Sequence, residues 1–332
     1  MMKQHWFPVL LFCICCAGVW HSCQQVRDAR REQEVADRND QQPAGADTLW
    51  HGAGVEDLPD DAQVRYGHDL VANTSAYLGP RGSVAHISNG MNCQNCHLQA
   101  GTVPFGNNYG KVYATYPLYR ARNNGIQDIY DRVNDCLQRS LNGQPLDSST
   151  KEMQAIYAYI KWLGKDVPKG TVPGGTSIMK LAYLDRPASP AAGKAVYAAT
   201  CQRCHGSDGQ GQLNPDHNGY AYPPLWGPHS FNDGAGLYRI SNMAGFVYNN
   251  MPFGTDYQHP QLSEATAWDV AAFVNSQPRP HYNQQNDWQM RERKPLDFPF
   301  GPYADPYTER QHKYGPFKPI QVFYASNKNK TP

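Results

Sequence analysis

Two segments of the chain, residues 149–163 and 263–277, carry apolar residues at helical spacing and resemble each other. The apolar positions recur three or four residues apart, at Ile156, Tyr159, Ile160 and Leu163 in the first segment and at Val270, Phe273 and Val274 in the second. This spacing places each set on one face of a helix. Ser149 and Ser263 begin the two segments, and serine is a favoured N-cap because its hydroxyl accepts a backbone N–H. The pattern therefore predicts two equivalent amphipathic helices.

A shorter helix is predicted upstream of each of these two helices. Ser189 followed by Pro190 is a typical helix start, and the helix is expected to run through Tyr197. The first copy begins near Asp61, with the sequence QVRYGHDLV. Between the copies, residues 165–177 are rich in Pro and Gly, which is typical of a linker.

The residues after the second copy, 278–332, are rich in Pro, Tyr and charge and have little helical periodicity. We interpret them as an extended arm that lies over the rest of the protein, because their aromatic density favours packing over a disordered tail. The whole chain has 29 Gly, 26 Pro and 21 Tyr residues, so loops and turns are abundant. Such a composition suits a fold whose core is partly supplied by something other than side chains. The formal net charge of +1 gives no sign of a nucleic-acid or acidic partner.

The first residues form an export signal. Lys3 precedes an apolar run, residues 6–20, which is too short to span a bilayer and has the length of a signal-peptide core. We assign residues 1–23 to the signal segment and residues 24–55 to a polar tether, and we expect a periplasmic protein. Cys23 follows a small residue, so the mature protein is either anchored by a lipid at Cys23 or soluble after cleavage. No other segment is apolar enough to cross a membrane.

Two copies of the motif C-x-x-C-H reveal the chemistry of the repeat, with CQNCH at residues 93–97 and CQRCH at residues 201–205. Two cysteines three residues apart reach the two vinyl groups of one porphyrin, and the next residue turns its imidazole onto the iron. A zinc site would need further Cys or His residues at suitable spacing, and neither copy has them. The motifs predict two covalently bound haem c groups, attached through Cys93, Cys96, Cys201 and Cys204 and ligated by His97 and His205.

Each copy thus has the order helix, haem motif, long loop, sixth iron ligand and C-terminal helix, which is the plan of a small cytochrome c domain. The predicted fold class is all-α, with two tandem class I cytochrome c-like domains, extended loops and a C-terminal arm. The expected ranges are 56–167 for the first domain, 168–188 for the linker, 189–280 for the second domain and 281–332 for the arm.

Met251 is the expected sixth iron ligand of the second haem. It lies in the sequence NNMPFG, and a thioether before a proline is typical of the distal side of an electron-carrying haem c. Met243 is the only near rival, and a methionine that merely fills the core is the alternative reading of Met251.

Cys136 stands where the first copy would have its own methionine. The sequence VNDC at 133–136 aligns with YNNM at 248–251, and no methionine in a similar context precedes the next helix. The alignment predicts that Cys136 is a thiolate ligand of the first haem. The alternative is a buried, unreactive cysteine, in which case this haem lacks a distal group or recruits His68 or His86.

The two sixth ligands indicate different roles for the two haems. A thiolate lowers the reduction potential of haem iron, whereas a methionine raises it. A pure electron carrier does not need a reactive thiolate, so this arrangement favours catalysis at the first haem and electron transfer at the second. Arg132 and Ser140 lie one helical turn before and after Cys136, and Arg120 and Arg122 lie just upstream. These side chains suit an oxyanion substrate, and the alternative is a solvated basic face.

The chain resembles the dihaem thiosulfate dehydrogenase / tetrathionate reductase family over most of its exported part. The most specific segment is YPLYRARNNGIQDIYDRVNDCLQRSLNG at residues 116–143, which surrounds Cys136. The resemblance also covers both haem motifs, NNMPFG, PFGPYAD at residues 299–305 and QHKYGPF at residues 311–317.

The resemblance implies a reaction in which two thiosulfate ions and one tetrathionate interconvert with the transfer of two electrons. A small electron-carrier cytochrome or a similar redox protein would be the partner. The implied roles are His97 and Cys136 as ligands of a catalytic haem, His205 and Met251 as ligands of an electron-transfer haem, and Arg122, Arg132 and Ser140 as substrate-binding residues. Some family members carry a lysine just before the methionine as an alternative ligand. Here that residue is Asn250, so Met251 is expected in both redox states.

Three other classes of protein compete with this interpretation. A dihaem electron-transfer protein without catalysis would have methionine at both haems, and a dihaem peroxidase would need an open iron with an acid–base pair. Another Cys-ligated cytochrome of the sulfur cycle would act on a carrier protein instead of free thiosulfate. An assay with free thiosulfate and tetrathionate separates these classes.

Overall fold

The structure is a computed structural model, and it describes residues 49–327. The predicted signal segment, Cys23 and most of the polar tether lie outside the described residues. Among the helices of the described range, none has the length and apolar character needed to span a bilayer.

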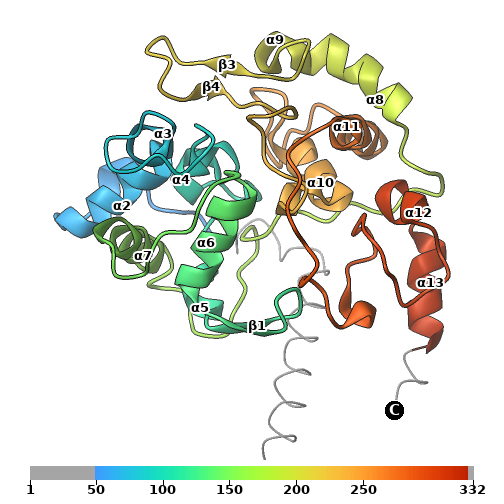
Figure 1. Ribbon diagram of the computed structural model, residues 1–332, viewed down its shortest axis with the longest axis horizontal. Helices are drawn as coiled ribbons and strands as arrows, with labels where there is room; N and C mark the ends of the chain where they lie inside the picture. Colours follow the sequence, from blue (N-terminus) through green and yellow to red (C-terminus); the bar gives the residue numbers. More distant parts are fainter. Residues whose placement is uncertain (1–48, 328–332) are drawn as a thin grey trace, which may run out of the picture. The chain divides into compact units, whose positions relative to one another are not determined.

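Helices dominate the described chain and form two groups that follow the same order (Figure 1). The first group is α2 (Ala62–Ala72), α3 (Thr74–Leu78), α4 (Leu98–Gly101), α5 (Val112–Thr115), α6 (Ile129–Arg139) and α7 (Lys151–Leu163). The second group is α8 (Pro190–Val196), α9 (Gln202–His205), α10 (Ile240–Asn250) and α11 (Glu264–Ser276). The short elements are η2 (Val55–Asp57), η3 (Cys93–Asn95), η4 (Tyr197–Cys201), which is π-helical, and η5 (Gly236–Tyr238).

Strands are limited, within residues 49–327, to two antiparallel hairpins. One is formed by β1 (Leu118–Arg120) and β2 (Gly125–Gln127), and the other by β3 (Gln212–Leu213) and β4 (Tyr220–Tyr222). The predicted all-α class, with long loops between the helices, is therefore confirmed.

The first and last helices of each group cross at a glycine. A Cβ atom on Gly67 of α2 would lie 2.0 Å from the carbonyl oxygen of Ala155 in α7. A Cβ atom on Gly193 of α8 would lie 1.9 Å from the carbonyl oxygen of Asp269 in α11. Such distances leave no room for a side chain, so glycine allows the two backbones to approach. The same close approach at equivalent positions supports the internal repeat.

The helix caps explain where the two amphipathic helices begin. Ser263 caps α11, as predicted. α7 is capped by Thr150, whose hydroxyl accepts the backbone N–H of Met153 at 3.3 Å, so the prediction of Ser149 was wrong by one residue. The hydroxyl of Ser149 instead donates to Asp147 Oδ1 at 2.6 Å, so Thr150 and not Ser149 caps the helix.

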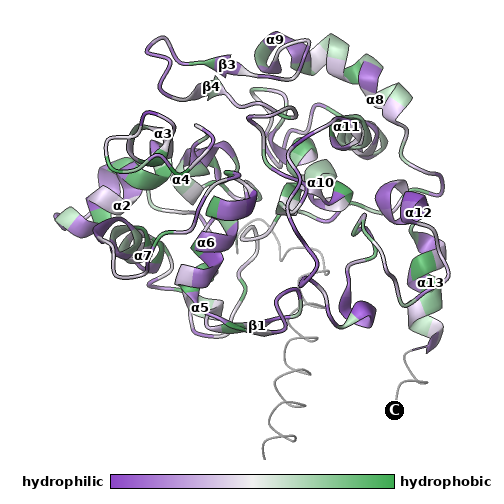
Figure 2. Cartoon of the chain, viewed as in Figure 1, coloured by the Kyte–Doolittle hydropathy of each residue, from purple (hydrophilic) through white to green (hydrophobic). Residues whose placement is uncertain are grey.

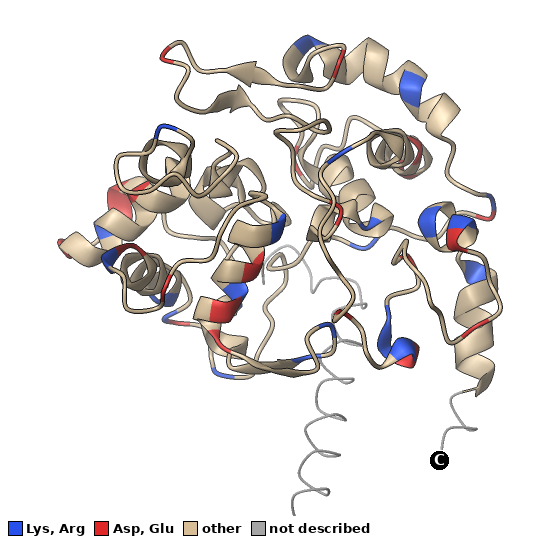
Figure 3. Ribbon diagram, viewed as in Figure 1, with Lys and Arg blue, Asp and Glu red and all other residues tan. Residues whose placement is uncertain are grey.

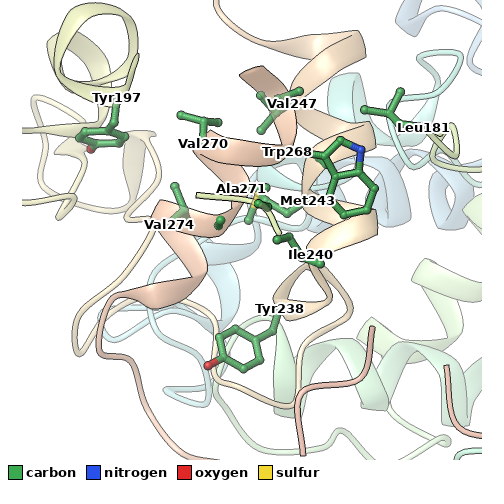
Figure 4. Close-up of a cluster of buried hydrophobic side chains, with 14 of the residues drawn as sticks. Leu181, Tyr197, Tyr238, Ile240, Met243, Val247, Trp268, Val270, Ala271 and Val274 are labelled. Carbon is green, nitrogen blue, oxygen red and sulfur yellow. The ribbon is translucent and has the colours of Figure 1, made fainter. Parts of the chain in front are cut away.

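The hydrophobic core of the second group is built on α10 and α11, around the buried side chain of Trp268 (Figure 4). In the first group, the core lies mainly between α2 and α7 and includes Leu70, Tyr159 and Ile160. A separate small cluster comprises Leu78, Met91, Leu137 and Leu141, and the haem-motif residues Cys93 and Cys96 pack against it.

The C-terminal arm is only partly extended. It contains η6 (Arg291–Arg293), α12 (Glu309–Tyr314) and α13 (Lys318–Asn327), which the sequence pattern did not predict. The imidazole of His312 is buried and contacts Leu296 O at 2.8 Å and Asp305 Oδ1 at 3.0 Å. Phe317 and Ile320 join the core of the second group, so the arm packs on it as expected.

Candidate functional site

The first haem motif is partly buried, and its two cysteines pack against an apolar cluster. Cys93 begins η3, and its backbone N–H donates to the Thr74 hydroxyl at 2.9 Å. Burial raises the pKa of the Cys93 thiol to about 11 and that of the Cys96 thiol to about 12, and the charge of Cys136 acts in the same direction on both. All three are free cysteines. Cys136 is therefore near enough to interact electrostatically with the two cysteines that the motif predicts as the haem attachment points.

The two motif histidines are held in the same way. Nδ1 of His97 donates to the carbonyl oxygen of Asn107, and Nδ1 of His205 donates to that of Pro223 at 2.9 Å. Burial lowers the pKa of His97 to about 4 and also lowers that of His205, so both rings are neutral. A neutral imidazole with Nδ1 engaged presents Nε2 to a metal. His97 also stacks on Tyr109, with ring centroids 4.5 Å apart.

This donor set fits haem c and not zinc. Between residues 49 and 327, no group of three or more His, Cys, Asp or Glu side chains could hold a bare metal ion. Each motif offers one oriented imidazole beside two free, partly buried thiols. An iron that arrives within a porphyrin needs only axial ligands from the protein, and the thiols supply the covalent attachment.

Cys136 lies on α6, which begins where Asp128 accepts the backbone N–H of Asp131 at 2.9 Å. The helix brings Arg132 and Cys136 together, and Nη1 of Arg132 donates to Sγ of Cys136 at 3.0 Å. The sulfur raises the pKa of Arg132 above its ordinary value, which keeps this guanidinium charged. Its charge also contributes to the low pKa of His97, after the larger effect of burial.

The two histidines that were alternatives to Cys136 occupy other surroundings. The ring of His68 lies on α2, 3.4 Å from Asp69 Oδ1, and meets the ring of Tyr159 edge-on at 5.5 Å. His86 is exposed. Ser140 follows α6, and its backbone N–H donates to the carbonyl oxygen of Cys136 at 2.8 Å.

Arg122 lies in the turn between β1 and β2 and forms a buried ion pair with Asp135, which sequence reasoning missed. Burial lowers the pKa of Arg122 to about 10, against the opposing effect of Asp135. Burial also acts to raise the pKa of Asp135, but Arg122, Arg132 and Arg139 outweigh it and hold that pKa below its usual value. Asp135 is therefore a carboxylate that orients arginines beside Cys136. The sequence signal was its place directly before Cys136, although its closest partner, Arg122, lies 13 residues away in the turn between β1 and β2.

Lys111 is a further basic residue that sequence reasoning missed. It directly precedes α5, and its Nζ contacts the hydroxyl of Ser177. Burial lowers the pKa of Lys111 to about 8, and the charges of Arg120, Lys180 and Arg132 lower it as well. Lys111 and the arginines thus form a basic cluster at the first haem site. Figure 3 shows basic segments on α6 and on the hairpin of β1 and β2.

The second haem site has an apolar character. Met251 directly follows α10, and both Met251 and Cys201 pack against the hydrophobic core of that group. The rival Met243 is buried inside that core (Figure 4). Figure 2 shows both hydrophobic and hydrophilic positions on α10, whereas α6, at the equivalent place in the first group, is largely hydrophilic.

A polar contact joins the surroundings of the two haem motifs. Nδ2 of Asn250 donates to the carbonyl oxygen of Phe105 at 3.3 Å, and the ring of Phe105 lies 5.3 Å from that of Tyr257. Phe105 is in the same loop as Asn107, the partner of His97. The loop that holds His97 therefore contacts the helix end that carries Met251.

Two small helical domains, each with an oriented histidine and two attachment cysteines, define a dihaem c-type cytochrome. Residues 83–168 match the family described as SoxA/TsdA, cytochrome c domain, and residues 190–278 match the family described as Cytochrome c.

Comparison with known proteins identifies the family. Thiosulfate dehydrogenase from Stutzerimonas stutzeri (strain A1501) is 38% identical over 228 residues, which are 68% of this chain and 71% of that protein. Thiosulfate dehydrogenase from Allochromatium vinosum is 38% identical over 234 residues, which are 68% of this chain and 83% of that protein. The solved structure of thiosulfate dehydrogenase (TsdBA) from Marichromatium purpuratum has a TM-score of 0.66 and 30% identity, and the match covers 78% of this chain and 54% of that one.

This chain belongs to the thiosulfate dehydrogenase family. The predicted family, the fold class, an oxidoreductase and two covalently bound haem c groups are thereby confirmed. The chain spans about half the length of the Marichromatium purpuratum structure, so that protein contains a region this chain does not match.

Proposed function

We propose that this protein interconverts thiosulfate and tetrathionate at Cys136, in a domain of residues 56–167, and passes electrons through a domain of residues 189–280. The observation that carries the proposal is the hydrogen bond from Arg132 to the sulfur of Cys136, beside the first haem motif. It combines a nucleophilic sulfur, a fixed cation and a haem attachment site in one place. A non-catalytic electron carrier has no use for this combination.

Cys136 is proposed as both the sixth ligand of the first haem and the nucleophile. Its proximity to Cys93 and Cys96 supports the first role. Its contact with Arg132 supports the second, because a neighbouring cation stabilises a thiolate. Met251 is proposed as the sixth ligand of the second haem, with His97 and His205 as the proximal ligands.

The basic cluster offsets the repulsion between two anions that must meet sulfur to sulfur. Two unit charges 4 Å apart repel by about 4 kcal/mol near a protein surface, and thiosulfate carries two charges. Arg122, Arg132 and Lys111 place fixed positive charge at the site without reorganisation during the reaction. Ser140, which follows α6, adds a hydroxyl donor.

The proposed covalent step balances in atoms and electrons. Sγ of Cys136 bonds to the terminal sulfur of one thiosulfate, and two electrons leave as this sulfur–sulfur bond forms. A second thiosulfate then attacks the attached sulfur, which forms tetrathionate and releases the Cys136 thiolate, as in thiol–disulfide exchange. The reverse sequence reduces tetrathionate. When bound, the two haems supply the redox chemistry, because each takes up or gives one electron.

The same proposal places the protein in the periplasm, exported by residues 1–23, with a small electron-carrier cytochrome or similar redox protein as its partner. The membrane takes part only if Cys23 is lipidated. The formal net charge of the chain is +1, which gives no sign of a nucleic-acid partner.

The test is an assay of the dihaem holoprotein with free thiosulfate plus an artificial electron acceptor, and with tetrathionate plus a reductant. Turnover in either direction that requires Cys136 supports the proposal. Haem reduction without tetrathionate formation would favour a non-catalytic electron carrier. Activity only with a sulfur-carrier protein would favour the other class of Cys-ligated cytochrome. Cys201→Ala is unsuitable as a control because it disturbs haem attachment, so Met243→Leu, in the core, serves instead.

A further inference from the structure

We propose that the C-terminal arm positions Arg122 for the substrate through Asp287, which acts by way of Arg139 and Asp135. This inference rests on the proposed function, since it takes Arg122 to bind thiosulfate or tetrathionate. It makes Asp287 a positioning residue, because its carboxylate touches Arg139 and not the substrate.

The contact between arm and site is a buried bidentate ion pair. Nη1 and Nη2 of Arg139, near the end of α6, donate to the two carboxylate oxygens of Asp287 at 2.7 and 2.9 Å. The side chains are only 5% and 8% exposed. The guanidinium of Arg139 also lies over the ring of Tyr282, 4.3 Å from its centroid. Two parallel charge-assisted hydrogen bonds fix the plane of a guanidinium as well as its position.

Asp135 connects this pair to Arg122. Its Oδ2 accepts hydrogen bonds from Nη2 of Arg122 and, at 3.3 Å, from Nε2 of Gln127, and its Oδ1 lies 3.5 Å from Nε of Arg139. Asp135 is therefore shared between two arginines. Because Asp287 accepts from Nη1 and Nη2 of Arg139, the carboxylate of Asp135 can form its closer contact with Arg122.

Removal of Asp287 would leave the buried charges of this network unbalanced. Arg122 and Arg139 carry two positive charges, and Asp135 and Asp287 carry two negative charges that balance them. Without the Asp287 charge, a buried arginine is left with one shared carboxylate, which is costly. Arg139 would then draw Asp135 toward itself, and Arg122 would lose its orienting partner.

The arm also holds the backbone of the same turn. The N–H of Trp288 donates to the carbonyl oxygen of Arg122 at 2.8 Å. The next residue, Gln289, accepts a hydrogen bond at its Oε1 from Nδ2 of Asn124 at 3.3 Å. Three consecutive arm residues thus contact the surroundings of Arg122: Trp288 its backbone, Gln289 the side chain of Asn124 in the same turn, and Asp287 the Arg139 that shares Asp135 with it.

A purely structural role for Asp287 is the competing explanation. Arg139 also contacts the second domain, where its carbonyl oxygen accepts the N–H of Asn232 at 3.1 Å and its Nη1 lies 3.5 Å from the carbonyl oxygen of Gly234. Loss of the pair could therefore lower stability alone. A structural role would not make the effect of Asp287 depend on Arg122, so this dependence is the quantity to measure.

The experiment compares Asp287→Asn, Arg122→Ala and the double variant in the dihaem holoprotein, with kcat and KM for thiosulfate, haem spectra and thermal unfolding. We expect Asp287→Asn alone to raise KM about tenfold with a smaller change in kcat, because a binding group is misplaced. In the Arg122→Ala background, the same substitution should change KM by less than about twofold, since coupled residues are not additive.

Asp269→Asn is the matched control. Asp269 forms an equally bidentate pair with Arg186, at 2.7 and 2.8 Å, and its side chain is 9% exposed. It joins the segment before α8 to α11, away from α6. This variant should lower thermal stability and leave KM unchanged.

A wild-type KM in Asp287→Asn overturns the inference, and so does an equal rise of KM with and without Arg122. If Asp287→Asn does not fold, Asp287→Glu replaces it, because it keeps the charge and displaces the carboxylate by one methylene. A rise of about threefold that also depends on Arg122 is then expected, and an unchanged KM overturns the inference. Absence of turnover in the wild-type protein would overturn the proposed function and this inference together.

Discussion

Arg132 and Cys136 lie one turn apart on α6, with a hydrogen bond of 3.0 Å from the guanidinium to the sulfur. The pair places a permanent cation against a residue that the family resemblance assigns to iron. A charged donor stabilises a thiolate in both of its proposed states, bound to iron and free to attack. The contact therefore links the proposed iron ligand, Cys136, directly to a proposed substrate-binding residue, Arg132.

Replacement of Cys136 by methionine separates its two roles. Cys136→Met should leave two bound haems, because a thioether is also an iron ligand, but reduce turnover by at least about a thousandfold, since it cannot form a covalent sulfur adduct. The reduction potential of the first haem should rise. Pyridine haemochrome analysis, redox titration and the two-direction assay measure these effects. Wild-type rates in this variant would show that Cys136 is not a nucleophile and only sets the reduction potential of the first haem.

The two site arginines should give different signatures. Arg132→Ala should raise KM and also change the spectrum and potential of the first haem, because Arg132 contacts the sulfur of Cys136. Arg122→Ala should raise KM by about tenfold or more and leave the haem spectra intact, because its partner is Asp135. Identical spectra for both variants would show that the hydrogen bond to sulfur has no influence on the iron.

The ligand of the second haem can be read from its far-red charge-transfer band. Met251→Gly should abolish the band that is typical of histidine and methionine ligation, whereas Cys136→Ala should preserve it. Met243→Leu is the control, since Met243 is buried in the core and the two side chains have similar volume. Loss of the band in Met243→Leu, and not in Met251→Gly, would exchange the two assignments.

Lys111 predicts a pH dependence of substrate affinity. Its pKa is lowered to about 8, so the ammonium is charged below pH 8 and neutral above it. An anion prefers the charged form, and KM for thiosulfate should therefore rise above pH 8, by up to about tenfold at pH 9. The neighbours Arg120, Arg132 and Lys180 keep the background positive. Lys111→Gln should have a raised KM at pH 7 and lose this step, and an unchanged pH profile would exclude Lys111 from the site.

The crossing glycines predict a large loss of stability. Gly67→Ala and Gly193→Ala each place a methyl group within 2.0 Å or less of a backbone oxygen and should lower the free energy of unfolding by about 3 kcal/mol. Gly236→Ala is the control, because a Cβ there meets no atom within 4 Å, and its effect should stay within about 1 kcal/mol. Equal melting temperatures for the three variants would contradict the close helix approach.

The features that could be predicted from the sequence depend on residues that lie close together in the chain. A haem with two vinyl groups dictates the cysteine spacing, and helical periodicity dictates α7 and α11, so both could be recognised locally. The neighbourhood of Arg132 and Cys136 was also predictable, because residues four apart on a helix share a face. The misplaced cap at Ser149 shows the limit, since two adjacent hydroxyl residues offer the same signal and only the competing bond to Asp147 decides.

The remainder depends on contacts between distant parts of the chain. Asp287 and Arg139 are 148 positions apart in the sequence, and no local pattern around either residue predicts their contact. The buried state of Lys111 depends on how its loop packs against Ser177. The two arm helices are short, and α12 has only six residues, so their periodicity was too brief to recognise.

Phe317 and Ile320, from the arm, complete the interior of the second cytochrome domain. The ring of Phe317 lies 5.7 Å from that of Trp268, and Ile320 is fully buried. The match to the Cytochrome c family model ends at residue 278, well before these two side chains. The folded core of this domain therefore extends beyond the residues of that match, and a fragment cut at residue 278 would lose the ring that packs on Trp268. The same arm carries Asp287, so one segment both completes the core of the second domain and contacts Arg139 of the first.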